Sequence, residues 1–276
     1  MQPGDTTPST PPPGPAPRAH LSGISPAVWG LALAFVPLFY VFGIQTWIRP
    51  HYEFSPLAII GAGVLIWART PTVRALGARS RWPVALIALA AVALGWALLR
   101  HSTFTVPVAF ILAVAAVGAA TGGVRLLLAW WPAFALLALT VRLPYTWDFT
   151  LVRTLRDLTA VSGSRVLDAL GYAHALVGNV IEVGARQLMV EDACSGVNSL
   201  FSTLACTVFL AGIAGRGAVH TAALLTAAVG WVFVANIARV VLVVAAAERG
   251  VDIAGGWRHD ALGLFTYAIG LALTLS

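Results

Sequence analysis

The chain has 276 residues, of which 59% are hydrophobic and only 10% are charged. A soluble globular domain carries roughly 25% charged residues, so this composition, with a mean hydropathy of +0.85, indicates an integral membrane protein. The net charge of +6 comes from arginine alone, because the sequence contains no lysine. This absence excludes a Ser/Lys dyad, a Schiff-base lysine and a P-loop lysine. The arginines lie between apolar runs, which favours membrane-flanking loops over a nucleic-acid-binding surface.

The N-terminal segment differs in composition from the rest of the chain. Residues 1–26 are rich in Pro, Ser and Thr and cannot bury a core. We therefore expect a disordered, Pro-rich cytoplasmic tail, followed by one transmembrane domain over 27–276. Eight apolar runs follow, most of them near the roughly 20 residues that a bilayer requires, and the sequence thus predicts an all-α, polytopic bundle of about eight spans. The runs are 27–48, 54–68, 82–99, 103–122, 124–143, 196–214, 218–247 and 259–275.

The orientation follows from the short loops. The segment between the second and third runs carries four arginines and no acid, which places it in the cytoplasm by the positive-inside rule. Those arginines are Arg69, Arg74, Arg79 and Arg81. Alternation then predicts that 49–53, 100–102, 144–195 and 248–258 are extracytoplasmic.

The long extracytoplasmic segment, 144–195, has its own pattern. Four apolar residues at helical spacing predict an amphipathic helix lying on the outer leaflet. They are Leu151, Leu155, Leu158 and Val161. Further on, the apolar segments 180–183 and 187–190 flank Gly184 and predict a short hairpin that leads to the sequence EDACSG.

Three reactive side chains converge on the extracytoplasmic side of this topology. Arg239 lies inside the apolar run 218–247, where a charge is expensive unless it faces protein or water. Cys194 immediately precedes the sixth run, and His259 opens the eighth. The topology was assigned without these residues, so their convergence indicates a functional site.

Such a trio supports acyl transfer. Cys194 would be the nucleophile, and a helix N-terminus or a nearby cation favours its thiolate. His259 would accept the thiol proton and later protonate the leaving amine. Arg239 stays protonated and would hold the oxyanion or the substrate carbonyl. Asn236, three residues before Arg239 on the same helix face, is a second donor or an orienting partner, and Asp192 is a further supporting candidate.

The same residues carry a resemblance to a known family. Ala-Cys-Ser-Gly at 193–196, Asn-Ile-Ala-Arg at 236–239, and His259 followed by Gly263 resemble the pattern of the exosortase/archaeosortase family. The resemblance is best over about 143–275 and implies a polytopic membrane cysteine transpeptidase. It implies that Cys194, Arg239 and His259 are catalytic, and no cofactor is expected.

The resemblance also implies partners and a location. Family members act on exported proteins whose C-terminal sorting signal has a short motif, a transmembrane helix and a basic end. We therefore expect a multi-pass protein of the cell inner or plasma membrane, surrounded by lipid, with its active site at the extracytoplasmic face. The enzyme would cleave the tail through a Cys194 acyl-thioester and pass the product to an acceptor or to water.

Other readings stay open at this point. Arg239 could line an anion pathway in a transporter or channel, although the polar residues gather at one end of three runs rather than along several. A structural assembly factor is a third possibility. Metal-dependent proteolysis lacks an HExxH motif, and Cys206, twelve residues from Cys194, is too far along a helix to share a metal with it. Cys206 is expected to pack, and His51 and His174 show no evident partner in the sequence.

Overall fold

The computed structural model describes residues 50–70, 82–100, 102, 104–190 and 196–276, together with positions 33, 35, 36, 40, 43 and 44. The predicted N-terminal tail and most of the first predicted span lie outside these residues. The helices are η2 (Pro50–Tyr52), α2 (Ser55–Arg69), α3 (Trp82–Arg100), α4 (Thr105–Ala129), α5 (Trp131–Leu139), α6 (Tyr145–Ala169), α7 (Val197–Ile213), α8 (Ala218–Glu248) and α9 (Gly256–Leu275). The strands are β1 (Ala175–Val177), β2 (Val180–Val183) and β3 (Arg186–Met189).

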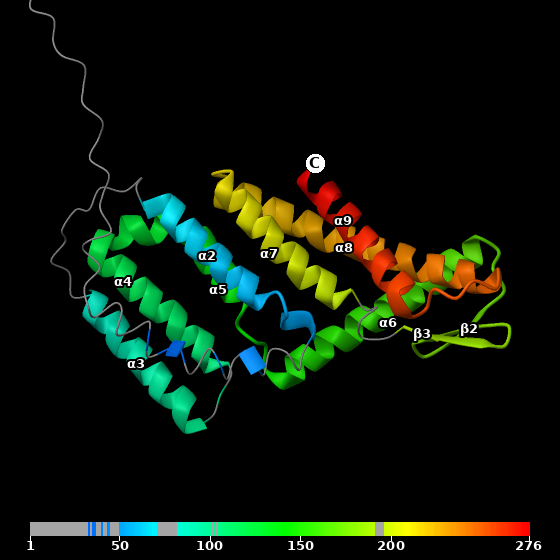
Figure 1. Cartoon of the computed structure of the whole chain (residues 1–276), viewed down its shortest axis with the longest axis horizontal. Helices are drawn as coiled ribbons and strands as arrows, with labels where there is room; N and C mark the ends of the chain where they lie inside the picture. The colour runs from blue at the N-terminus through cyan, green and yellow to red at the C-terminus, as the bar shows by residue number, and fades with distance from the viewer. Residues whose placement is uncertain are drawn as a thin grey trace, which may run out of the picture.

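The predicted helical membrane bundle agrees with this architecture. Within the described residues, α3, α4 and α8 are long and apolar enough to cross a membrane, and α2 and α7 are shorter apolar helices. The count of eight spans stays a prediction. Figure 1 shows α3 packed on α4, α2 and α5 beside α7, and α7 beside α8 and α9. Helix α6 runs across the end of the bundle at which α7 and α9 begin.

The fifth predicted span, 124–143, is not one continuous helix. Gly123 has φ of 63° and ψ of −159°, which interrupts helical geometry near the end of α4. A conformation with positive φ favours glycine because glycine has no Cβ. The helical path resumes up to Ala129, and α5 then begins at Trp131 with Pro132 in its first turn, where proline is well tolerated. Gly123 thus separates the predicted runs 103–122 and 124–143, and the second run is divided again at Trp130, between the end of α4 and the start of α5.

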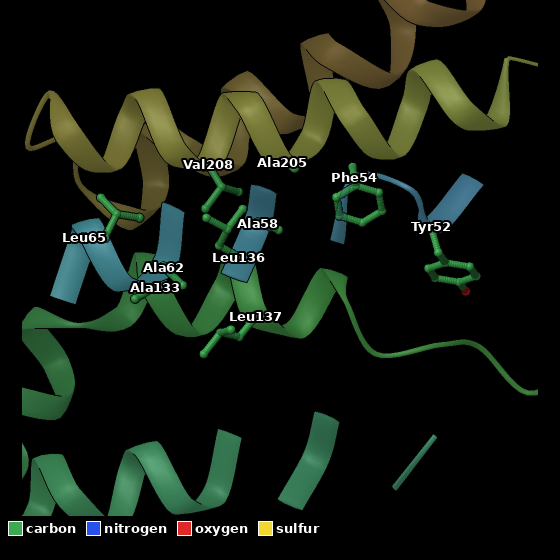
Figure 2. Packing of buried hydrophobic residues seen from close by; sticks show 10 residues of the cluster. All are labelled: Tyr52, Phe54, Ala58, Ala62, Leu65, Ala133, Leu136, Leu137, Ala205 and Val208. Carbon is green, nitrogen blue, oxygen red and sulfur yellow. The ribbon is translucent and has the colours of Figure 1, made fainter. Parts of the chain in front are cut away.

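The largest core lies between α2, α5 and α7. Figure 2 shows ten of its residues, and four of the ten are alanines, so the three helices approach closely. Gly61 continues this packing, because a Cβ there would lie 3.1 Å from the side chains of Leu136 and Phe209. At the opposite end of α7 from Val197, Arg69 donates hydrogen bonds to the carbonyls of Ala129 (3.2 Å) and Gly212 (2.7 Å). These bonds add a side-chain donor to carbonyls near the ends of α4 and α7, where the Gly212 carbonyl also accepts from the Gly215 N–H at 3.2 Å.

Helix α6 joins a small sheet to α8. The sequence predicts a hairpin here, and β2 and β3 pair antiparallel, with β1 added on the other side of β2. A helix forms where the amphipathic pattern predicts one, and its apolar stripe leaves Leu158 50% and Val161 38% exposed; that the stripe lies on the outer leaflet stays a prediction. The face that packs on the protein instead contains small residues, including Ala160 and Gly163. A Cβ on Gly163 would lie 3.1 Å from Val240 of α8, so close helix contact selects this face.

Candidate functional site

Helix α8 places a buried cation and a buried amide one turn apart. Arg239 is 9% exposed and Asn236 is 6% exposed, in a helix whose most apolar window has a mean hydropathy of 2.1. Three residues of separation put both side chains on one helix face. Arg239 lies nine residues before Glu248, about 13 Å below the end of the helix. The protein therefore holds a permanent positive charge at membrane depth, in contact with other helices.

Helix α9 brings His259 to this arginine. Arg239 Nη2 donates a hydrogen bond to His259 Nε2 at 2.5 Å, and His259 Nδ1 lies 3.3 Å from the Ile253 carbonyl oxygen. A guanidinium has only donors, so Nε2 must be the acceptor and carries no proton. The carbonyl in turn accepts the hydrogen on Nδ1. The pair of contacts selects one neutral tautomer, whose Nε2 lone pair faces the buried cation.

Gly263 provides the space that the guanidinium occupies. It follows His259 by one helical turn, so both residues face α8. A Cβ built on Gly263 would lie 3.2 Å from Arg239 Cζ and 3.2 Å from Nη2. Any larger residue would therefore press on the planar group that binds the imidazole.

Asn236, on the same face of α8 as Arg239, contacts two other helices. Its Nδ2 donates to Thr159 Oγ1 of α6 at 3.3 Å, and Thr159 is fully buried. On the other side, Gly196 forms the N-cap of α7 with φ of 78°, and a Cβ there would lie 3.0 Å from Asn236 Cγ. The start of α7 thus packs directly on Asn236. No side chain caps this start within the described residues, so its first amides keep hydrogen-bonding capacity.

One donor of Arg239 has no acceptor within the part of the chain that the structure describes. Among the described residues, nothing accepts a hydrogen bond from the buried Nε atom. An unsatisfied buried donor on a charged group destabilises a folded protein by more than the ~1–3 kcal/mol typical of a neutral one. This donor can therefore bind a further acceptor, and a substrate oxygen is a suitable one.

The structure brings together three of the five residues that the sequence singled out. Arg239 is hydrogen-bonded to His259, and Asn236 lies on the same face of α8 as Arg239, whereas Cys194 and Asp192 fall in 191–195, outside the described residues. Sequence reasoning missed Thr159, because a threonine beside the apolar stripe of an amphipathic helix gives no signal. The sequence motif included Gly263, but it did not indicate that this glycine leaves room for the Arg239 guanidinium. No group of three potential metal ligands occurs in the described part of the chain.

A second polar group lies near the start of α6. His51 Nε2 and Asp148 Oδ1 are 2.9 Å apart, and the Tyr52 hydroxyl lies 3.4 Å from the same oxygen. The Tyr52 hydroxyl also accepts from the Leu143 N–H at 2.9 Å, and the Arg142 guanidinium lies over the Tyr52 ring. Burial raises the pKa of Tyr52, the bond from Leu143 lowers it, and the Asp148 carboxylate raises it further, for a net increase. This group fastens η2 to the start of α6.

Two expectations about histidines are therefore wrong. His51 and His174 showed no evident partner in the sequence, but His51 is paired with Asp148. The side chain of His174 is 2% exposed, and it contacts Ser164 Oγ at 2.7 Å and the Tyr172 carbonyl at 2.9 Å. Cys206 packs between helices as expected, with its sulfur 3.4 Å from the Tyr267 hydroxyl.

The comparisons with known proteins agree with the motif pattern. Residues 47–276 match the family model described as transmembrane exosortase (Exosortase_EpsH). No curated protein and no solved structure matches the chain. The family match spans all the described helices from α2 to α9, including the residues of the site. Because it covers most of the sequence, the chain belongs to the transmembrane exosortase family.

Proposed function

We propose that the protein is a membrane-embedded cysteine transpeptidase or endopeptidase that cleaves the C-terminal sorting tail of exported proteins. The observation that carries the proposal is the group formed by Arg239, His259 and Asn236, with the start of α7 packed on Asn236. Cys194 precedes Gly196 by two residues, and two residues of chain span at most about 7 Å. This short connection supports the assignment of Cys194 to the same site.

The first half of the reaction forms an acyl-thioester. The substrate carbonyl oxygen takes the place of His259 Nε2 at the Arg239 guanidinium, and this exchange frees the Nε2 lone pair. The thiol of Cys194 gives its proton to Nε2, and the sulfur forms a bond to the carbonyl carbon. The negative charge moves to the oxygen, where Arg239 and Asn236 are donors preorganised by burial. The carbon–nitrogen bond then breaks, and His259 returns the proton to the leaving amine.

The second half resolves the thioester. An acceptor amine or hydroxyl, or a water molecule, attacks the carbonyl carbon while His259 accepts its proton. The carbon–sulfur bond breaks, and the proton on His259 goes to the sulfur. The uncapped first turn of α7 supports this cycle, because backbone amides at a helix N-terminus stabilise negative charge nearby. We place the site at the extracytoplasmic face of the cell inner or plasma membrane, as the positive-inside pattern indicates.

The two cysteines of the chain offer a matched test. A substrate can be chosen from the same genome as an exported protein whose sequence ends in a motif, an apolar helix and basic residues. We expect Cys194→Ala to leave this substrate uncleaved in membranes, with a loss of about 10³-fold or more. Cys206→Ala removes a thiol of α7 that contacts Tyr267 and should process normally. Wild-type processing by Cys194→Ala would exclude the enzyme, and anion flux that depends on Arg239 would favour the transporter instead.

A further inference from the structure

A lateral groove lies between α6, α7 and α8, next to the candidate site. Its volume is about 280 Å³, and its lining is almost entirely apolar. The groove ends at Gly196 and Asn236, so it is continuous with the group that contains Arg239. The walls and floor are formed by Leu155 and Leu158 of α6, Leu200 of α7, and Val229, Gly230 and Phe233 of α8.

The groove opens to the side of the bundle. Leu158 is 50% exposed and Val229 is 47% exposed, so one side is not covered by protein. From Val229 to Asn236 the groove follows α8 for about 10 Å, and it runs from the site toward the middle of this apolar helix. Because α8 is apolar enough to span a membrane, the open side faces lipid.

The surface that leads into the groove is flat. Ala222, Thr226 and Gly230 lie four residues apart on α8, and all three are exposed. A Cβ on Gly230 would meet nothing within 4 Å, and the Thr226 hydroxyl is satisfied by the Ala222 carbonyl at 3.0 Å. Small residues at this spacing allow a second membrane helix to approach closely. A flat surface offers no comparable advantage to a lipid chain, because a flexible chain also packs against an uneven surface.

We propose that this groove binds the apolar membrane helix of the substrate, a proposal that rests on the proposed function. A peptide chain that leaves the groove inside the membrane must be helical, since its backbone groups have no other partners there. No residue that lines the groove is charged, so an uncharged helix face complements it. A helix along α8 would end beside Asn236, and its first extracytoplasmic peptide bonds would reach Arg239 and His259. The groove would thus set the distance between the membrane helix and the cleaved bond.

Gly230→Leu tests the proposal by filling the groove. The matched control is Gly63→Leu in α2, another exposed helical glycine at which a Cβ meets nothing within 4 Å. Each full-length variant is assayed on two probes: the membrane-anchored substrate, and a soluble peptide with only the residues around the cleaved bond. Binding by remote parts of a substrate contributes to its turnover, so we expect Gly230→Leu to lower kcat/KM about tenfold or more for the anchored probe. The peptide should lose less than about twofold, and Gly63→Leu should lose neither.

The same pair of probes separates the two proposals. Equal loss of both probes in Gly230→Leu, or loss of neither, would overturn the groove proposal while wild-type cleavage of the peptide still supported the enzyme. Peptide cleavage by Cys194→Ala would instead overturn the proposed function. A photo-reactive residue at Val229, in the Cys194→Ala background, identifies the occupant. A covalent adduct with the mass of the substrate supports the proposal, whereas adducts only with phospholipid or with a second copy of the chain contradict it.

Discussion

Gly263→Ala tests whether the Arg239 guanidinium needs the space that this glycine leaves. The added Cβ would lie 3.2 Å from Arg239 Cζ, well inside the ~3.5–4.0 Å at which carbon atoms pack favourably. The arginine must then move by a few tenths of an ångström, which misaligns the hydrogen bond that it is proposed to donate to the substrate oxygen. A hydrogen bond from a charged group contributes about 1.5–3 kcal/mol. Losing most of this in the transition state lowers kcat by about 10- to 100-fold.

Stability should respond differently from activity in this variant. Replacing glycine by alanine inside a helix stabilises it by about 0.5–1 kcal/mol, which offsets the crowding. Gly270→Ala is the matched control in the same helix, because its Cβ would lie 3.7 Å from Ala235 Cβ, an ordinary contact. The assay is the initial cleavage rate of the anchored substrate by purified protein, measured with thermal unfolding. A wild-type rate in Gly263→Ala, or an equal loss in Gly270→Ala, would refute the reasoning.

Three further changes give distinct outcomes. Arg239→Lys replaces a planar fork by a point charge, which cannot reproduce the geometry in which the guanidinium donates to a substrate oxygen, so we expect at least about a tenfold fall in kcat; a wild-type rate would mean that only the charge matters. Thr159→Val removes the acceptor of Asn236, worth about 0.5–1.5 kcal/mol, and should lower kcat severalfold, whereas Thr159→Ser should restore it. Thr203→Val, which removes an equally buried hydroxyl from α7, is the control, and a similar kcat loss there would argue against a specific role. Arg69→Gln, at the far end of α7, should destabilise the protein by about 1–3 kcal/mol in chemical unfolding without slowing peptide cleavage; slower cleavage would contradict this separation.

The sequence predicted the second half of the bundle well. The predicted runs 196–214 and 218–247 agree with α7 and α8 within one or two residues, because each is a continuous apolar run flanked by glycine or charge. The proximity of Arg239 and His259 was predicted by counting the spans and assigning each loop to one side of the membrane. Asn236 followed from its spacing of three residues. These inferences use only local periodicity and connectivity, which a sequence contains explicitly.

Other features depend on packing between distant segments. His51 and Asp148 are 97 residues apart, and Asn236 and Thr159 are 77 apart, so neither pair leaves a local pattern. The side of α6 that packs on α8 was not predicted, because its small residues, such as Gly163, form no apolar stripe. The division of the run 124–143 depended on the backbone at Trp130, where α4 ends, and on Pro132 in the first turn of α5. Cys194 and Asp192 stay predictions for the substitutions above to test.

The loop between α8 and α9 helps to set the state of His259, although the loop lies outside the candidate site. Surface loops usually tolerate inserted residues, and residues 249–255 form such a loop. Here, however, the Ile253 carbonyl holds one ring nitrogen of His259. An inserted residue would carry that carbonyl away and let the imidazole exchange between its two neutral forms, only one of which presents its basic nitrogen inward. The length of this loop is therefore part of what the proposed enzyme requires, although none of its side chains need touch a substrate.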